Sequence, residues 1–161
     1  MGPIRVGICG FGTVGSGTFR VLERNREDIA ARVGRDVVVT HIGARRDNPR
    51  CSTGHTRVSR DLFEVVRDPD VDIVVELIGG CDMARALVLE AIANGKHVIT
   101  ANKALIAQHG NGIFAAASAR GVTVAFEAAV GGGIPIIKAI REGLAANRIA
   151  WVAGIINGTG N

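Results

Sequence analysis

The sequence predicts an α/β protein in which a doubly wound, mostly parallel sheet carries helices on both faces. Short β-branched runs alternate along the chain with segments whose apolar residues recur every three or four positions, as they do in helices. The expected strands are apolar almost throughout, which is typical of parallel strands that are buried on both faces. Right-handed crossovers between such strands follow almost by rule. Together these observations indicate an architecture of the Rossmann type.

The elements follow in a regular order. A strand is expected over residues 4–9, then a glycine turn, then a helix from Thr13 to about Arg32. The later strands are expected at Val37–Ala44, Val71–Ile78, His97–Ala101 and Val122–Glu127. Helical spacing is clearest in the stretches Leu62–Val66, Met83–Ala93, Ile113–Ala119 and Ile134–Ala145.

Residue types at the ends of these segments indicate where the helices start and stop. Asp61 and Asp82 are expected N-caps, and Gly95 and Gly121 are expected stops. The longest loop is expected between Arg45 and Arg60, because no strand or helix pattern covers it.

The domain division follows from the last part of the chain. Residues 1–148 are expected to form one domain, since their length suits a single core. A further apolar run at Ile149–Ile156 precedes the polar segment Asn157–Asn161, which resembles the middle of a site. We therefore expect residues 149–161 to begin a second, substrate and catalytic domain whose remainder is absent from this chain.

Composition narrows the possible partners. The net charge is +4 and the pI is near 9.5, yet aromatic residues are only 4% and the basic residues are dispersed, which argues against nucleic acid as a partner. A local group of Arg45, Arg46, Arg50, Arg57 and Arg60 favours a small anionic ligand instead. No apolar run has the length of a membrane span, and no signal peptide precedes the first strand. We expect a cytoplasmic protein without a membrane partner.

The spacing Gly10-Phe11-Gly12-Thr13-Val14-Gly15 lies between the first strand and the first helix. In that context it predicts dinucleotide binding. The first glycine allows a sharp turn, the second lets the backbone approach a pyrophosphate, and the third lets helix and strand pack closely. The pyrophosphate then lies on the N–H groups of the helix N-terminus. The alternative is a glycine-rich turn in an unrelated α/β protein.

The end of the second expected strand bears on the choice of nucleotide. Many folds of this type place an acidic residue there, which holds the ribose 2′-hydroxyl group. This sequence has Ala44 and Arg45 instead. A guanidinium can bind a 2′-phosphate with two hydrogen bonds, which favours NADP over NAD. The alternative is a solvated arginine pair on a loop.

Two further features mark the ends of later strands. Gly79 and Gly80 follow the strand that contains Glu76, and glycines there leave space at the edge where cofactors bind. They also suit an ordinary turn, and Glu76 itself receives no role. Lys103 opens a helix after the fourth long strand, where it could stabilise an alkoxide or carry a proton. The alternative is a surface lysine, although cations are disfavoured at helix N-termini.

The segment Glu127–Pro135 combines a carboxylate with three glycines. A carboxylate and several backbone carbonyls can hold a hard cation, but from physical arguments alone a glycine-rich hinge is the stronger interpretation. The four histidines do not cluster, so no metal or triad role is expected for them. Cys9, Cys51 and Cys81 lie far apart, and we expect them to be reduced and structural.

Five blocks in this order resemble the homoserine dehydrogenase family: GFGTVGSG, VVELIGG, VITANKALIA, FEAAVGGGIPIIKAIREGL and GIINGTGN. The resemblance covers the whole chain, and the last four blocks are far more specific than the glycine spacing. It implies NAD(P)-dependent interconversion of L-homoserine and L-aspartate 4-semialdehyde, on the route to threonine, methionine and isoleucine. It also implies a small-molecule substrate and a cytoplasmic homo-oligomer.

The resemblance also implies roles for individual residues. Phe11, Thr13 and Val14 join the glycines at the cofactor, and Arg45 lies near the 2′-phosphate. Lys103 lies beside the nicotinamide, as a catalytic or cofactor-binding residue. A monovalent-cation site, usually for sodium, matches Glu127, Val130, Gly132 and Ile134, and Asn157-Gly158-Thr159 matches the entry to the substrate domain. The family's substrate-binding carboxylates and second catalytic lysine have no counterpart before residue 161, so little turnover is expected from this chain alone.

Two alternatives to that function remain. One is another semialdehyde or amino-acid dehydrogenase with the same cofactor half. The other is a non-catalytic module that senses a dinucleotide.

Overall fold

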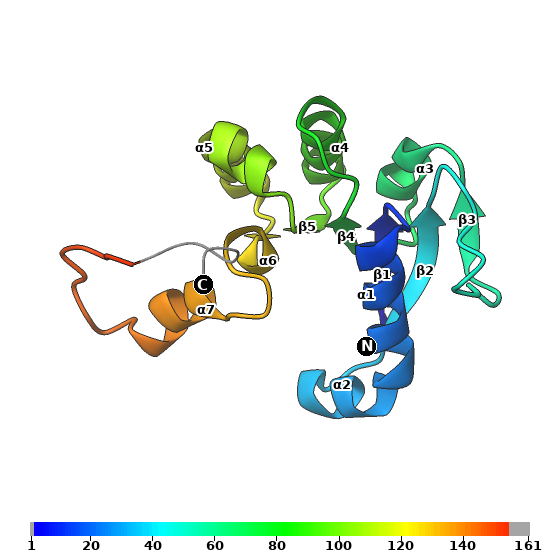
Figure 1. The fold of residues 1–161 in the computed structure, drawn as a ribbon, viewed down its shortest axis with the longest axis horizontal. Helices are drawn as coiled ribbons and strands as arrows, with labels where there is room; N and C mark the ends of the chain where they lie inside the picture. Colours follow the sequence, from blue (N-terminus) through cyan, green and yellow to red (C-terminus); the bar gives the residue numbers. More distant parts are fainter. Residues whose placement is uncertain (1, 155–161) are drawn as a thin grey trace.

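The computed structural model describes residues 2–154 and contains one six-stranded sheet, in which every pairing is parallel (Figure 1). The strand order is β3-β2-β1-β4-β5-β6. The strands are β1 (Ile4–Cys9), β2 (Val37–Gly43), β3 (Arg57–Ser59), β4 (Ile73–Glu76), β5 (His97–Thr100) and β6 (Val124–Ala125). The doubly wound α/β fold predicted from the sequence is confirmed.

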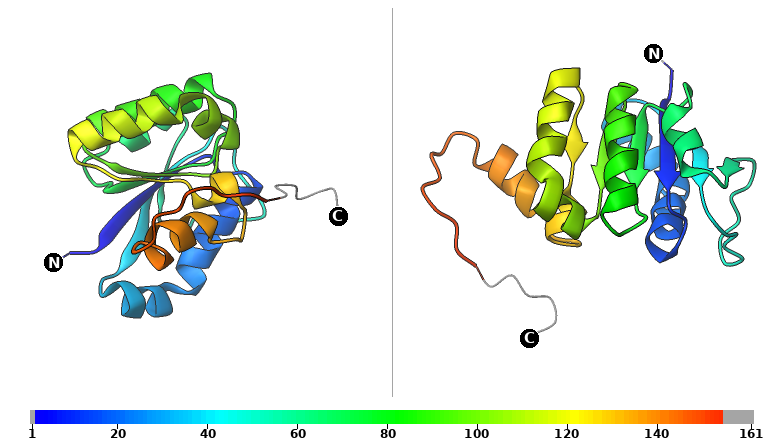
Figure 2. Two further views of the ribbon diagram at one scale, coloured as in Figure 1. Left: turned by 90° about the vertical axis from the view of Figure 1, so that its left-hand side faces the viewer. Right: turned by 90° about the horizontal axis from the view of Figure 1, so that it is seen from above.

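Helices cover both faces of the sheet, as Figure 2 shows in its left view. One face carries α3 (Leu62–Arg67), α4 (Asp82–Ala93) and α5 (Lys103–Arg120). The other face carries α1 (Thr13–Arg24) and α2 (Arg26–Val33). Beyond β6 come α6 (Glu127–Val130), α7 (Ile136–Lys138) and a π-helical turn, Ala139–Gly143.

The core has two halves because successive strand residues point to opposite faces. In β4, Val74 belongs to the cluster under α3, α4 and α5, whereas Val75 belongs to the cluster on the side of α1. In β1, Cys9 belongs to the first of these clusters and Ile8 to the second. All four side chains are at most 5% exposed. The central strands β1 and β4 are therefore buried on both faces, as the sequence predicts, whereas His97 and Ile99 of β5 and Arg57 and Val58 of β3 are exposed.

The strand order reverses beside β1, because β2 lies on one side of it and β4 on the other. The loops that leave β1 and β4 therefore run to opposite faces of the sheet. In open parallel sheets such a switch point leaves a crevice at the carboxyl ends of the strands. The Gly10–Gly15 turn leaves β1 at this crevice.

Two predictions of local structure before residue 61 were wrong. The loop expected between Arg45 and Arg60 contains the edge strand β3, and the helix expected to reach Arg32 is interrupted at Asn25. Asn25 has φ −105° and ψ 23°, outside the helical range, and its side chain accepts a hydrogen bond from Arg24. Asn bonds locally in this way and is a poor interior helix residue.

The edge strand β3 is fixed by side chains that lie far apart in the sequence. His41 in β2 is fully buried, with Nδ1 2.6 Å from Asp68 Oδ2 and Nε2 2.8 Å from Ser59 Oγ. Arg57 also pairs with Asp68 and with Glu64 of α3. No local sequence pattern carries these contacts, which explains why the strand was missed.

The helix ends agree with the sequence in part. Asp61 caps α3 by accepting a hydrogen bond from Phe63 N at 2.9 Å, and Gly121 ends α5 with φ +71°. The cap predicted at Asp82 was wrong, because Cys81 takes the N-cap position and Asp82 lies in the first turn of α4. An acidic residue remains favourable there because of the helix dipole.

The last described segment differs most from expectation. Glu127 begins the short helix α6 rather than ending a strand, and the helix expected at Ile134–Ala145 is shortened to α7 and the π-helical turn. Residues 149–154 form neither strand nor helix, and Trp151 is 79% exposed. The sequence pattern at Asn157-Gly158-Thr159 lies outside the described residues.

Candidate functional site

The turn after β1 requires glycine at two positions. Gly10 has φ +101°, a conformation that side chains disfavour, and a Cβ there would lie 2.7 Å from Leu77 O. A Cβ at Gly15 would lie 1.9 Å from Gly10 O, so the start of α1 can pack on the turn only without a side chain. A Cβ at Gly12 would meet no protein atom within 4 Å. Surrounding protein atoms therefore leave no room for a side chain at Gly10 or Gly15, whereas Gly12 faces open space.

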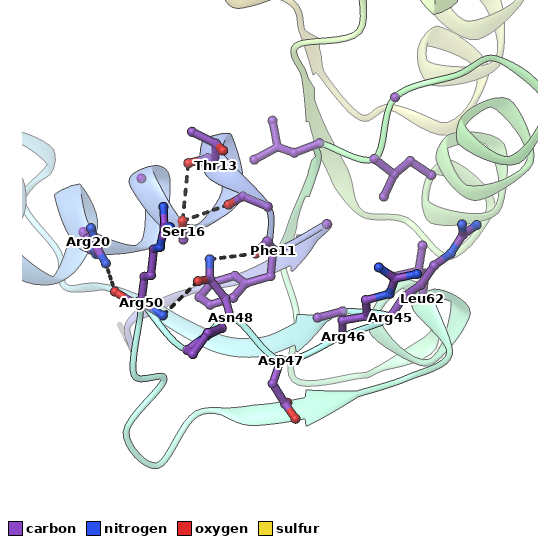
Figure 3. A pocket seen from close by; sticks show the side chains of 18 of the residues that line it. Phe11, Thr13, Ser16, Arg20, Arg45, Arg46, Asp47, Asn48, Arg50 and Leu62 are labelled. Atoms are coloured by element: carbon purple, nitrogen blue, oxygen red, sulfur yellow. Dashed lines mark hydrogen bonds between the residues drawn. The ribbon is translucent and has the colours of Figure 1, made fainter.

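The open side of the turn faces a groove of about 880 Å³ (Figure 3). Gly10, Phe11, Gly12 and Thr13 line it from the turn, and Gly79 lines it from the loop after β4. The groove thus lies at the switch point of the sheet. The N-terminal N–H groups of α1 border it, which suits an anionic group.

The arginine group named from the sequence divides into two parts. Arg45, Arg46 and Arg50 line the groove, and Figure 3 shows Arg45 and Arg46 side by side just beyond β2. Arg45 contacts Met83 Sδ at 3.2 Å. Arg57 and Arg60 serve the fold instead, since Arg60 pairs with Asp47 and donates to Ala44 O.

Sequence reasoning missed several groove residues, among them the polar residues Ser16, Arg20 and Asn48. Ser16 and Arg20 line the groove from α1, where positions 13, 16 and 20 share one helix face, so their spacing could have revealed them. Arg20 donates a hydrogen bond to Arg50 O, which ties α1 to the loop after β2. Asn48 donates to Phe11 O at 3.2 Å and so braces the glycine turn from the same loop, a contact with no local sequence signal.

A second hollow of about 370 Å³ adjoins the groove, because Leu77 and Gly79 line both. Its other walls include Val14 from α1 and Lys103 from the start of α5. Lys103 is exposed, and the residue before it, Asn102, caps α5 by accepting from Leu105 N. The structure therefore brings Lys103 and Gly79, which are far apart in the sequence, to one end of the crevice.

The segment with the carboxylate and glycines lies after β6. Glu127 Oε1 accepts from Ile137 N at 2.8 Å and Oε2 accepts from Lys138 N at 3.0 Å, so its carboxylate holds the start of α7. Gly133 has φ +78°, and Ile134 N donates to Gly131 O. The Glu127 carboxylate thus connects the start of α6 to the start of α7 across the glycine-rich turn.

Other reactive side chains are few in the described part of the chain. Burial, with the charge of Glu76, raises the pKa of the Cys9 thiol to about 12, so this thiol stays protonated at neutral pH. Across residues 2–154, no three His, Cys, Asp or Glu side chains gather as a metal site would need. None of the helices described between these residues is long and apolar enough to cross a membrane.

Comparison with known proteins gives one consistent result. The family model described as homoserine dehydrogenase, NAD binding domain, matches residues 10–127. The homoserine dehydrogenase of Pseudomonas aeruginosa is 68% identical over all of this chain, which spans only 37% of that protein's length.

Solved structures agree with that match. A homoserine dehydrogenase from Thiobacillus denitrificans superposes with a TM-score of 0.90 and 60% identity, covering 97% of this chain and 36% of the other. A hyperthermophilic archaeal homoserine dehydrogenase solved with NADPH shares the fold, with a TM-score of 0.74, 24% identity, and coverage of 89% of this chain and 50% of the other. With the glycine turn and groove in the places such a domain requires, this chain belongs to the homoserine dehydrogenase family, of which it carries the NAD-binding domain.

Proposed function

We propose that the complete protein interconverts L-homoserine and L-aspartate 4-semialdehyde, with NADP(H) bound by residues 1–148 of this chain. One observation carries the proposal: the groove at the switch point runs directly into the hollow that holds Lys103, in a chain of this family. A dinucleotide could thus lie along the groove and present one end to Lys103. Residues 149–161 then begin the substrate domain.

Each part of the groove has a task in this proposal. Gly12 and the N-terminus of α1 receive the pyrophosphate, because the backbone there is open and its N–H groups are free to donate. The nicotinamide, when bound, supplies hydride transfer to or from the carbon that bears the oxygen. The ammonium of Lys103 stabilises negative charge on that oxygen and assists its proton transfer. Gly79 and Gly80 leave the space beside it.

NADP is the proposed nucleotide rather than NAD. Arg45 follows β2 and lines the groove beside Arg46. Among residues 2–154, the one acidic residue that lines that end is Asp47, which pairs with Arg60. Two guanidinium groups can bind a 2′-phosphate through charge and paired hydrogen bonds, and they bind an uncharged 2′-hydroxyl group less strongly.

A monovalent cation, sodium in the first instance, is proposed at Glu127, Val130, Gly132 and Ile134. The donor set fits such an ion because it consists of one carboxylate and backbone carbonyls, all hard oxygen ligands. The two hydrogen bonds that Glu127 accepts leave each carboxylate oxygen a further lone pair. The bound ion would brace the segment from α6 to α7.

The cation proposal predicts a salt response. Activity of the complete enzyme should rise with sodium or potassium at constant ionic strength, and Glu127→Gln should flatten that response because the charged ligand is lost. Glu142→Gln is the control, since Glu142 is an exposed partner of Lys138 and lies outside the proposed ligand set. A Glu127→Gln enzyme with the parent's salt dependence would remove this site from the proposal.

We also propose, from the family resemblance, that the complete protein works in the cytoplasm as a homo-oligomer on a small-molecule substrate. Two alternatives to this activity are a related dehydrogenase and a dinucleotide sensor. Steady-state kinetics with homoserine distinguishes the proposed activity from both.

Steady-state oxidation of homoserine by the complete protein, with NADP and with NAD, tests the activity. Lys103→Met should lower kcat by roughly a hundredfold, the usual scale for a lost proton donor or oxyanion partner. Its thermal midpoint should barely move, because Lys103 is exposed. Lys138→Met is the matched control at another exposed lysine. A wild-type protein that binds the nucleotide but oxidises no homoserine would contradict the proposal.

A further inference from the structure

The carboxylate of Glu76 has no role in the proposed function, yet its position is unusual. Glu76 is the last residue of β4 and is fully buried. No residue between 2 and 154 forms an ion pair with it at 4.0 Å or less. Because glutamate is almost never fully buried without a partner, something else must compensate for its loss of water.

Both oxygens of this carboxylate accept hydrogen bonds. Oε1 accepts from Ile78 N at 2.9 Å, and Oε2 accepts from Thr100 Oγ1 at 2.6 Å. Thr100 is the register partner of Glu76 on the neighbouring strand β5, so the second bond crosses between the strands. Bonds to an ionised acceptor are the stronger class. Glu76 therefore joins the carboxyl ends of β4 and β5.

The contacts continue into the two turns that border the Lys103 hollow. Thr100 Oγ1 accepts from Asn102 N at 3.0 Å, and Asn102 Nδ2 donates to Gly80 O at 2.5 Å. Gly80 lies two residues after Ile78, whose N–H is held by Glu76. The bonds thus close a ring through Glu76, Thr100, Asn102, Gly80 and Ile78.

The ring fixes two features of the hollow at once. Gly79 and Gly80 both have φ +72°, although a Cβ at either would meet no atom within 4 Å, so conformation rather than space sets this turn. Asn102 also accepts from Leu105 N and so starts α5 with Lys103 as its first residue. A change at Glu76 would release both turns.

We propose that Glu76 is a positioning residue: its buried carboxylate, acting through Thr100 and Asn102, sets the Gly79–Gly80 turn and the place of Lys103. Glu76 lines the hollow beside Lys103, and we assign it to positioning because both of its carboxylate oxygens already accept hydrogen bonds from Ile78 and Thr100. This inference rests on the proposed function, which gives Lys103 and the glycine turn their tasks. It predicts damage confined to the nicotinamide end of the crevice, because none of the ring's hydrogen bonds involves Gly12 or Arg45.

The test uses the complete protein with Glu76→Gln, Thr100→Val and Thr100→Ser. Glutamine keeps the shape of Glu76 but places an amide donor or a neutral acceptor on Thr100, and valine removes the hydroxyl that relays to Asn102. Serine retains that hydroxyl. Thr40→Val is the matched control, since Thr40 also loses one hydroxyl bond, to Asp70 O, far from the hollow.

The first two variants should lose about tenfold to a hundredfold in kcat for homoserine, because small misplacements of reacting groups cost that much. Their affinity for ADP-ribose, which lacks the nicotinamide, should stay near the wild-type value. Thr100→Ser should restore most of kcat, and Thr40→Val should keep it. Should Glu76→Gln fail to fold, the Thr100 pair carries the test.

Three results would overturn the inference: unchanged kcat in Thr100→Val, no rescue by Thr100→Ser, or loss of ADP-ribose affinity in parallel with kcat. A wild-type protein inactive on homoserine would instead contradict the proposed function. The ring is then tested by binding alone: Glu76→Gln and Thr100→Val should weaken NADPH and not ADP-ribose. Equal effects on the two ligands would overturn the inference in that case too.

Discussion

Single residues in the turn after β1 show that one residue type can serve different purposes. Gly10 is required by its positive φ and by the nearby Leu77 O, and Gly15 by its contact with Gly10 O. Gly12 is required by neither, since the space beside it is open. The fold therefore explains Gly10 and Gly15, whereas for Gly12 the explanation we propose is the close approach of a pyrophosphate.

Arg45 provides the clearest test at this scale. A hydrogen bond to a charged group contributes about 1.5–3 kcal/mol, and about 1.4 kcal/mol is a tenfold change in affinity. Arg45→Ala should therefore weaken NADP binding by roughly ten- to a hundredfold and NAD binding much less. Calorimetric titration with both nucleotides measures this, with Arg120→Ala at the far end of α5 as the control. Equal losses for both nucleotides would show that Arg45 does not contact the 2′-phosphate.

At the scale of elements, polar side chains join segments that the hydrophobic pattern alone would leave loosely placed. Arg5 at the start of β1 donates to Asp72 through its backbone N–H, Nε and Nη2, at 2.8 to 3.1 Å. Asp72 immediately precedes β4, so these bonds set the relation of the two central strands. Nearby, Lys96 donates to Asp68 O and Val71 O, and burial lowers the pKa of its ammonium.

These bonds make part of the stability depend on pH. The hydrogen bond from Arg5 is the largest influence on Asp72 and holds the pKa of its carboxyl below the ordinary 3.8, with burial acting in the opposite direction. A carboxyl whose pKa is lower in the folded state stabilises the fold above its unfolded-state pKa. That contribution is lost as pH falls through the folded-state value.

Asp72→Asn should therefore lower the free energy of unfolding at neutral pH, and its difference from wild type should shrink as pH falls below about 4. Urea unfolding from pH 7 to pH 3 measures the difference. Asp36→Asn is the control, because its ion pair with Arg26 is exposed and 3.7 Å long, and such pairs contribute little. A difference between Asp72→Asn and wild type that stays constant over this range would contradict the assignment.

At the scale of the whole molecule, the segment beyond β6 is the least integrated part of the chain. Its exposed apolar side chains are Ile134, Ile136, Leu144, Ile149, Trp151 and Val152. Contiguous exposed apolar residues mark surfaces that other structure covers. Since this chain spans 37% of its Pseudomonas relative, we expect later residues of the complete protein to cover this segment.

Trp151, the single tryptophan of the chain, can be used to test whether later residues cover the segment beyond β6. Its fluorescence in residues 1–161 alone should be quenched readily by acrylamide, because the side chain is 79% exposed. In the complete protein the same residue, isolated by difference from Trp151→Phe, should be protected and its emission should move to shorter wavelength. Equal quenching in the two proteins would show that the segment stays exposed.

The sequence by itself determined the fold class, the order of the strands except β3, and the glycine turn between β1 and α1. These follow from local patterns, because apolar periodicity and turn residues act over a few positions. The same patterns placed Arg45, Gly79 and Lys103 after strands, and parallel strands bring such residues to one edge.

Only the tertiary structure decided which side chains meet. Arg57 and Arg60 are the same residue type as Arg45, but each forms ion pairs with carboxylates of other segments of the chain. Glu76 and Thr100 are 24 residues apart and become partners only through the register of β4 and β5. The physical reason is range: a hydrogen bond depends on a few tenths of an ångström between distant residues, whereas a sequence pattern records only which face or turn each residue occupies.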